Sequence, residues 1–208
     1  MELLLFTSAM PVKAREKILF AALELFTSHN YSDTTILEVV ERARVSKTTF
    51  YQFFASKENL LTTLVEQLAG EILSEVQDAI EREEKIPHKG YAGIRRYIQL
   101  CTEREAVARF LLVSSVGFST EVEEVRRNAH IRFSHLIYQT AQRGMPQSVS
   151  DTAIRVVARG MVGAVNEVVI QQIADTDNKM DIDELARLLN RIVVDSFTML
   201  ALNPLHEG

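Results

Sequence analysis

Four polar side chains, those of Lys47, Thr48, Thr49 and Gln52, lie close together in the sequence, and all of them can donate hydrogen bonds. An ammonium group pairs with a phosphate, hydroxyls hydrogen-bond to phosphates and base edges, and the amide of Gln52 can pair with adenine. Presented on one short helix, this set of groups suits the major groove of duplex DNA. The residues on either side of this set determine whether the four side chains lie together on one short helix.

The flanking residues predict two short helices separated by a tight turn. Apolar residues recur at helical spacing on both sides of the turn, at Ile36, Val39, Val40, Ala43, Phe50 and Phe54. Val45 can fill the space between the helices, and Ser46 can cap the second helix by accepting a hydrogen bond from a backbone N–H. The first turn of that helix then faces away from the core. A surface hairpin of two helices with ordinary polar caps is the alternative interpretation.

An amphipathic helix is predicted before this pair, over residues 13–28. Its apolar face consists of Ile18, Ala21, Ala22, Leu25 and Phe26. Asn30 suits the left-handed conformation that closes a helix. Thr34 or Thr35 then caps the next helix, where Glu38 can complete a capping box.

The rest of the chain is predicted to form longer helices. A helix capped by Ser56 extends to about Glu84 and would be on the order of 40 Å long at 1.5 Å per residue. Residues 86–90 form the clearest break, because they contain Pro87 and Gly90. Five further helices are expected, over 92–102, 105–116, 120–143, 150–175 and 182–202, with a turn over 175–178. No strand alternation or fixed repeat stands out, so we expect an all-α fold.

The charge of the chain is distributed unevenly. Its 208 residues, with 47% hydrophobic and 25% charged residues, are typical of a globular protein of one or two domains. The net charge is −5, which at first argues against a nucleic-acid partner. Residues 13–57, however, contain seven basic against five acidic residues, a net of +2, whereas 58–84 contain one against eight, a net of −7. The local charge of a docking face matters more than the total, so DNA binding through the basic segment is possible.

The sequence predicts no metal, no cofactor and no membrane partner. Cys101 is the single cysteine, which excludes an internal disulfide and fits a reducing compartment. His130 and His135 are five residues apart and do not share a helix face, and no recognised metal-ligand spacing is present. The apolar residues 1–6 are too few to span a bilayer, so we expect a frayed or docked N-terminal extension on a cytoplasmic protein.

The last two predicted helices offer more apolar surface than one core obviously needs. Two such helices from each of two copies can pair as a symmetric four-helix interface. The residues that we expect in this homodimer interface are Ile154, Val157, Met161, Val165, Leu188, Ile192 and Phe197. The alternative is that both helices are buried inside one subunit.

The stretch from Arg15 to Leu60 resembles the N-terminal domain of the TetR family of bacterial transcriptional regulators. The resemblance covers about a quarter of the chain in register and without a gap. The residues that carry it are Ile18, Ala21, Ala22, Leu25, Phe26, Tyr31, Thr34, Thr35, Ala43, Val45, Ser46, Lys47, Thr49, Tyr51, Phe54, Ser56, Lys57 and Glu58. The resemblance implies a three-helix, helix-turn-helix DNA-binding head over residues 1–57 and a helical-bundle body for ligand binding and dimerisation over 58–208.

The resemblance also implies which residues contact DNA. By position these are Thr35 at a phosphate, Lys47, Thr48 and Thr49 along the major groove, and Tyr51 and Lys57 on the DNA backbone. Gln52 is a further candidate for a base contact. The sequence departs from the family at Asn30, Arg44 and Thr48, where glycine is usual. Arg44 would be strained if left-handed, by about 1–2 kcal/mol, and a phosphate contact would compensate for the strain.

A regulatory body implies an apolar pocket whose occupant changes the spacing of the two DNA-binding heads. Aromatic and polar residues of the middle helices are the candidates, although each also suits an ordinary core position. They are Tyr97, Cys101, Phe110, Ser114, Phe118, Phe133, Ile137, Met161 and Asn166. As a set they indicate a small, mostly apolar effector.

These expectations combine into a ligand-responsive transcriptional repressor that binds a palindromic double-stranded DNA operator as a homodimer and is released by its effector. The alternative is a dimeric helical ligand-binding or interaction protein whose helix-turn-helix has lost DNA binding. An enzyme is not expected, because no histidine follows a glutamate by three residues. There is also no Gly-x-Ser-x-Gly motif and no glycine-rich phosphate loop.

Overall fold

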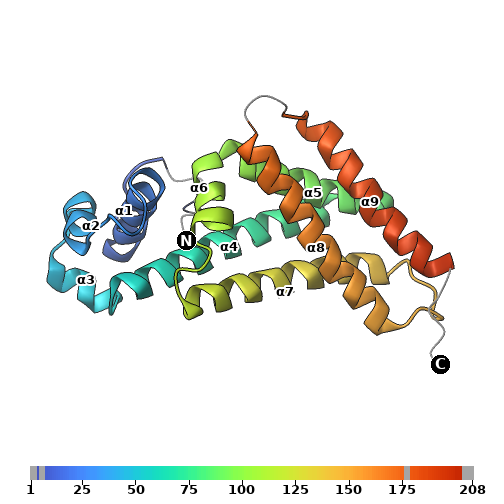
Figure 1. Ribbon diagram of the computed structural model, residues 1–208, viewed down its shortest axis with the longest axis horizontal. Helices are drawn as coiled ribbons and strands as arrows, with labels where there is room; N and C mark the ends of the chain where they lie inside the picture. The colour runs from blue at the N-terminus through green and yellow to red at the C-terminus, as the bar shows by residue number, and fades with distance from the viewer. Residues whose placement is uncertain (1–3, 5–7, 176–178, 203–208) are drawn as a thin grey trace. The chain divides into compact units, whose positions relative to one another are not determined.

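In a computed structural model, which describes residues 4, 8–175 and 179–202, the chain is helical and its described residues contain no strand (Figure 1). The helices are α1 (Ala14–Ser28), α2 (Ile36–Ala43), α3 (Lys47–Phe53), α4 (Lys57–Arg82), α5 (Ile86–Glu103), α6 (Glu105–Arg109), α7 (Thr120–Gln142), α8 (Asp151–Ala174) and α9 (Ile182–Leu202). A short π-helix, Phe110–Ser114, continues α6. The predicted all-α fold is confirmed.

The chain divides into two compact units. The first contains the described residues up to Ile72 together with Arg104–Arg127, and the second contains Leu73–Glu103 and the described residues from Asn128 onward. This division follows packing, and it assigns the first part of α4 to the same unit as α1, α2 and α3. The expected functional boundary between residues 57 and 58 remains a prediction.

In the first unit, α1 packs against α2 and α3, and the predicted apolar face of α1 is the reason. Ile18, Ala21 and Ala22 are completely buried, as are Val39 of α2 and Phe50 of α3. Burial of apolar surface is the main stabilising contribution to such a small helical unit. These contacts hold the two helices of the motif in place.

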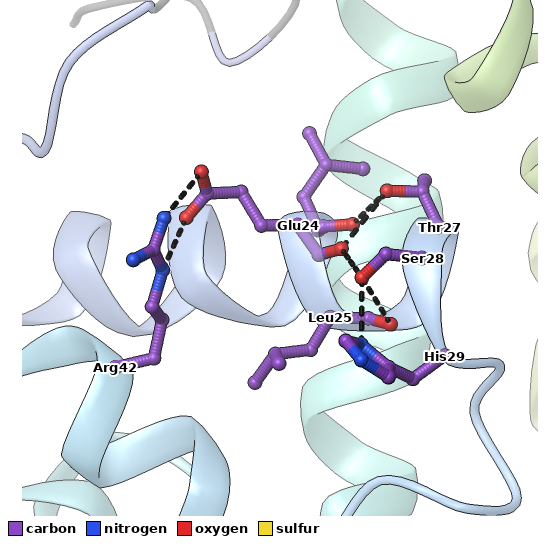
Figure 2. A network of polar contacts seen from close by, with 7 residues as sticks. Glu24, Leu25, Thr27, Ser28, His29 and Arg42 are labelled. Carbon is purple, nitrogen blue, oxygen red and sulfur yellow. Dashed lines mark hydrogen bonds and ion pairs between the residues drawn. The ribbon is translucent and has the colours of Figure 1, made fainter.

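A charged pair adds an orienting contact between α1 and α2. Both guanidinium nitrogens Nε and Nη2 of Arg42 donate to the Glu24 carboxylate at 2.9 Å, as Figure 2 shows. The same view shows the last turn of α1, where the hydroxyls of Thr27 and Ser28 donate to backbone carbonyl groups one turn earlier. The Arg42 pair is exposed, so it orients the helices more than it stabilises them.

The predicted capping box is present at the start of α2, with Thr35 as its N-cap. The hydroxyl of Thr35 accepts from the backbone N–H of Glu38 at 3.2 Å, and the Glu38 carboxylate accepts from the backbone N–H of Thr35 at 2.6 Å. These hydrogen bonds lower the pKa of Glu38. Thr34, the other candidate cap, is buried and donates instead to the carbonyl of Asn30.

In the second unit, α5 packs against both α8 and α9, and α8 packs against α9. Arg95 of α5 donates from Nε to Asp183 of α9 at 2.6 Å, and the Tyr91 hydroxyl donates to the same oxygen at 3.3 Å. The hydrogen bond from Arg95 is the main reason why the pKa of Asp183 is lowered. This polar contact joins the first turns of α5 to the start of α9.

Two helix boundaries differ from the prediction. The break between α4 and α5 is confirmed, but α5 begins at Ile86 rather than at residue 92, so Pro87 lies in its first turn. Proline is tolerated there because the first N–H groups of a helix have no helical partner. The predicted helix over 105–116 is divided into α6 and the π-helix, beside which Arg126 donates to the carbonyl of Leu111.

The chain ends and one turn are described only in part. Of the predicted N-terminal extension, Leu4 is buried, and its backbone N–H donates to the Glu71 carboxylate at 3.1 Å. The remaining residues of the 1–6 segment lie outside the described residues. The same is true of the predicted turn over 175–178, except for Asp175, which follows α8.

Candidate DNA-binding surface and ligand cavity

The short helix α3 begins as the sequence predicts. Ser46 is its N-cap, and the Ser46 hydroxyl accepts from the backbone N–H of Thr49 at 3.0 Å. The hydroxyls of Ser46 and Thr49 are also 2.9 Å apart and share a hydrogen bond. Phe50 and Phe54 are buried, which fixes the opposite face of α3 against the unit. The polar residues of the first turn therefore remain on the outside.

Arg44, in the turn before α3, has the left-handed backbone conformation for which we predicted strain. Its φ is 53° and its ψ is 50°, and its backbone N–H donates to the carbonyls of Val40 and Glu41. A residue with a side chain pays about 1–2 kcal/mol for this conformation relative to glycine. Asn30, with φ of 69°, is also left-handed, as predicted. The Arg44 side chain is exposed next to α3.

The predicted DNA contacts fall into two groups, according to whether they already take part in hydrogen bonds of the head. Lys47, Thr48, Tyr51 and Gln52 are exposed, and within the described residues Lys47 has no ion-pair partner. Tyr51 is 56% exposed while its ring packs edge-on against Phe50. These side chains are available to a ligand on the outer face of α3. Their contacts with DNA remain predictions.

Thr49, Thr35 and Lys57 are already engaged in the head. Thr35 is the N-cap of α2, and Thr49 hydrogen-bonds to Ser46, the N-cap of α3. The Lys57 ammonium donates to the carbonyls of Tyr31 at 3.0 Å and Thr34 at 2.9 Å. The Tyr31 hydroxyl donates to Glu58 at 3.2 Å, and burial, together with this carboxylate, raises the pKa of Tyr31 to about 12. Lys57 therefore has a structural role beside the predicted contact with the DNA backbone.

The second unit contains a cavity of about 290 Å³. It is lined by residues of the last part of α4, of α5, α7, α8 and α9, and of the loop after α7. Most of the lining is aliphatic or aromatic, and none of the lining residues is charged. This volume is close to the lower end of the range of about 300–1,000 Å³ that is usual for small-molecule sites. The cavity can take an apolar molecule of modest size.

The cavity brings together four of the nine residues expected at a ligand, namely Tyr97, Phe133, Ile137 and Asn166. The Tyr97 hydroxyl donates to the Asn166 carboxamide oxygen at 2.8 Å, and the rings of Tyr97 and Phe133 are in contact at 5.8 Å between centroids. The structure thus places this polar pair in the cavity wall. A role in ligand binding remains a prediction.

The other five expected ligand residues do not line this cavity. Phe110, Ser114 and Phe118 belong to the first unit, where Phe110 packs against Phe26 and Phe118 against Tyr31. Cys101 is buried, and its burial raises the pKa of the thiol to about 12. The sulfur of Met161 accepts from the Ser196 hydroxyl at 3.6 Å.

Several cavity residues were not among the expected ones, because an aliphatic lining has no signature in the sequence. Asn190 of α9 is the exception: it lies on the same helical stripe as Ala186, Val193 and Phe197, which are buried. An asparagine at a core-facing position is unusual enough to have indicated a polar contact inside the body.

The residues expected at a dimer interface are divided between the inside and the outside of the subunit. Ile154, Val165 and Phe197 are buried within the second unit, and Val157 and Met161 are partly buried. Leu188 and Ile192 are 47% and 45% exposed. Met199 and Leu202, which the prediction did not include, continue their exposed face along α9.

Other kinds of site are not evident in the described part of the chain. No three His, Cys, Asp or Glu side chains gather as a metal site would require. Among the helices as described, none is both long enough and apolar enough to span a bilayer.

The helix-turn-helix region matches a known family. Residues 18–64 match the family model of bacterial regulatory proteins of the tetR family. The match begins in α1, includes α2 and α3, and ends in α4. It therefore coincides with the exposed surface of α3 and the helices that position it.

Two curated relatives are HTH-type transcriptional regulators. YuxN of Bacillus subtilis (strain 168) is 25% identical over 116 residues, which are 54% of this chain and 40% of that protein. HbdR of Aromatoleum sp. (strain CIB) is 33% identical over 67 residues, which are 32% of this chain and 29% of that protein. The chain thus spans less than half the length of either relative.

Solved structures show the fold over a larger part of the chain. The fatty acid degradation regulator FadR from Bacillus halodurans has a TM-score of 0.71 and 17% identity, with 89% of this chain and 97% of that one covered. FadR from Bacillus subtilis, in complex with stearoyl-CoA, has a TM-score of 0.70 and 17% identity over 86% and 97%. Residues 18–64 thus match bacterial regulatory proteins of the tetR family, and the chain as a whole shares the fold of these solved regulators.

Proposed function

We propose that the protein is a transcriptional repressor that binds a palindromic operator as a homodimer and leaves it when a small, mostly apolar effector occupies the cavity. The observation that carries this proposal is the outer face of α3. It presents exposed Lys47, Thr48 and Gln52 from a helix whose start is capped by Ser46 and whose other face is buried. Such a helix suits insertion into a major groove.

The groups on this face divide by chemistry. Lys47 and Arg44 offer positive charge to phosphates, which supports affinity, whereas Thr48 and Gln52 offer hydrogen bonds to base edges, which support sequence preference. Tyr51 and Thr35 offer hydroxyl groups that we propose contact the DNA backbone. The exposed side chain of Arg44 in the turn, held there at a cost in backbone strain, supports this proposed role.

The exposed apolar residues of α9 support the proposed dimer. Leu188, Ile192, Met199 and Leu202 are spaced so that they share one face of the helix, and each is at least 45% exposed. A contiguous exposed apolar face of this kind is typical of an interaction surface. A second copy of the chain would bury it in a symmetric interface and would supply the second α3 for a palindrome.

The uncharged cavity supports an apolar effector. Among the similar structures, Bacillus subtilis FadR is in complex with stearoyl-CoA, so an acyl chain is a reasonable first class of effector to test. A repressor rather than an activator is proposed, because a repressor that acts by occluding a promoter requires no further protein partner. A ligand that binds the released state better shifts the population away from DNA.

Selection from a pool of random duplexes at near-physiological salt tests the DNA-binding proposal. We expect a palindrome with half-sites about 34 Å apart, or one helical turn, to be enriched. The matched control is the Lys47→Ala, Gln52→Ala double variant, which keeps the buried face of α3 and should enrich no palindrome. Failure of the wild type to enrich any sequence, even at low salt, would favour the alternative of a ligand-binding protein that has lost DNA binding.

A further inference from the structure

Asn190 is the polar residue of the cavity wall whose side chain lacks a partner. Its carboxamide oxygen is fully buried and accepts no hydrogen bond from any described residue. The amide nitrogen Nδ2 is not enclosed in this way, and Asn190 lines the cavity. An amide of this kind is costly to bury unless a ligand or water satisfies it.

Gly90 makes room for the enclosed oxygen of Asn190. A Cβ atom at residue 90 would lie 2.5 Å from the Asn190 oxygen, so the oxygen occupies the space that a side chain would need. Gly90 and Asn190 both line the cavity, from α5 and α9 respectively. The oxygen packs against the glycine, and the N–H₂ group is the part of the carboxamide that a molecule in the cavity can reach.

The other polar side chains of the wall, including Thr140, already make hydrogen bonds. The Tyr97 hydroxyl donates to Asn166, as described above, and the Thr198 hydroxyl donates to the carbonyl of Val194 at 2.9 Å. Asn190 differs from these residues in that neither atom of its carboxamide has a hydrogen-bond partner among the described residues. A polar ligand atom is therefore favoured beside Asn190, where α5 and α9 both line the cavity.

The absence of charge in the lining limits what that polar atom can be. An ionised carboxylate inside the cavity would be desolvated without a cation beside it, which is strongly unfavourable. A smaller recess shares Ile80, Leu136 and Thr140 with the cavity and contains the cations Lys89 and Arg143. Lys89 already donates to the backbone carbonyls of Ile80 and Glu83. Glu81 in the same recess would repel an anion.

We propose that Asn190 determines the effector's polar group: its N–H₂ group donates to a neutral acceptor, such as an ester, thioester or amide carbonyl. The apolar chain of that molecule fills the rest of the cavity. A free acid of the same length binds poorly while it is ionised. This inference rests on the proposed function only in taking the cavity as the effector site.

The test uses the full-length protein without DNA and measures displacement of a neutral apolar dye. The probes are methyl decanoate, the decanoate ion and an alkane of matched length. The wild type is expected to bind the ester at least tenfold more tightly than the decanoate ion at neutral pH. Equal affinity for the ester and the ion would overturn the proposed preference for a neutral group, and this comparison needs no variant.

Variants then test whether Asn190 makes the proposed hydrogen bond to the ester. Asn190→Leu, of similar size, is expected to weaken ester binding by roughly three- to tenfold, the value of one hydrogen bond, and to leave alkane binding within about twofold. Gly90→Ala, which displaces the carboxamide without removing it, should have the same effect. The matched control is Thr198→Val, whose hydroxyl is already satisfied, and it should change neither affinity. An equal loss for ester and alkane in Asn190→Leu would show that Asn190 only fills space.

The outcome is separable from that of the proposed function. A cavity that binds the ester through Asn190 but has no effect on DNA affinity would leave this inference standing and contradict release by an effector. A protein that binds its operator but prefers the decanoate ion would leave the proposed DNA binding standing and contradict this inference.

Discussion

The ammonium nitrogen of Lys57 lies 4.2 Å from the centroid of the Tyr31 ring, and it donates to the Tyr31 carbonyl as well. Lys57 is the first residue of α4, and Tyr31 lies in the connection between α1 and α2. The pair therefore fixes the connection that leads into the helix-turn-helix. A cation over an aromatic face contributes about 0.5–1 kcal/mol at an exposed site and more when it is desolvated.

Lys57→Met should therefore lower the stability of the head. We expect a loss of about 1–2 kcal/mol in the free energy of unfolding by urea, since two partly buried carbonyls lose their donor. Lys47→Met is the matched control, because Lys47 is exposed, and its stability should lie within about 0.5 kcal/mol of the wild type. Equal stability of the two variants would show that Lys57 has no structural role.

Arg44→Gly should separate stability from DNA binding. Glycine removes the left-handed strain, so we expect the head to gain about 1 kcal/mol in stability. If Arg44 touches a phosphate, the same variant should bind operator DNA more weakly. Thermal unfolding and duplex titration measure the two effects, and Arg44→Asn, which tolerates the same backbone, is the control. Unchanged DNA affinity would remove Arg44 from the proposed contacts.

Cys101 should resist thiol reagents in the folded protein. Burial raises the pKa of its thiol to about 12, so almost no thiolate is present at mildly alkaline pH, and the side chain is 1% exposed. We expect a colorimetric disulfide reagent to modify the native protein only at the rate of unfolding, and the urea-unfolded protein at once. Rapid modification of the native protein would contradict the packing described for α5.

The Arg95 and Asp183 pair should make stability depend on pH on the acidic side. The folded pKa of Asp183 is lowered, so the pair stabilises the protein above the ordinary aspartate pKa, and this contribution is lost as the pH falls through the lowered value. Asp183→Asn should therefore have a lower melting temperature than the wild type at neutral pH, with the difference shrinking below about pH 4. Asp195→Asn, in a looser exposed pair with Arg191 at 3.7 Å, is the control and should change little. A difference between Asp183→Asn and the wild type that stays constant across this pH range would contradict the coupling.

Local features of the head could be predicted from the sequence, because short-range rules determine them. The capping box at Thr35, the cap at Ser46 and the left-handed Asn30 each depend on a residue type within a few positions of its partner. The helical fold also followed from apolar spacing alone. The start of α5 was missed because proline both ends a helix and begins one, and only the surrounding packing shows which applies.

The cavity was less accessible to prediction because it is lined by several separate helices. Tyr97 and Asn166 were identified by type, but their partnership depends on how α5 packs against α8. Phe110 and Phe118, chosen for the same reason, pack instead against aromatic residues of the first unit. Spacing along one helix shows which face is buried, but it does not show what that face meets.

The most direct measurement is the affinity of the protein for its enriched duplex as a function of salt, for the wild type and Lys47→Ala. We expect the logarithm of affinity to fall linearly with the logarithm of salt concentration, because phosphate contacts release counterions. Lys47→Ala should bind more weakly and should have a shallower slope, by about 0.9 for each phosphate contact that is lost. An affinity that does not change with salt, or coincident curves for the two proteins, would contradict DNA binding through α3.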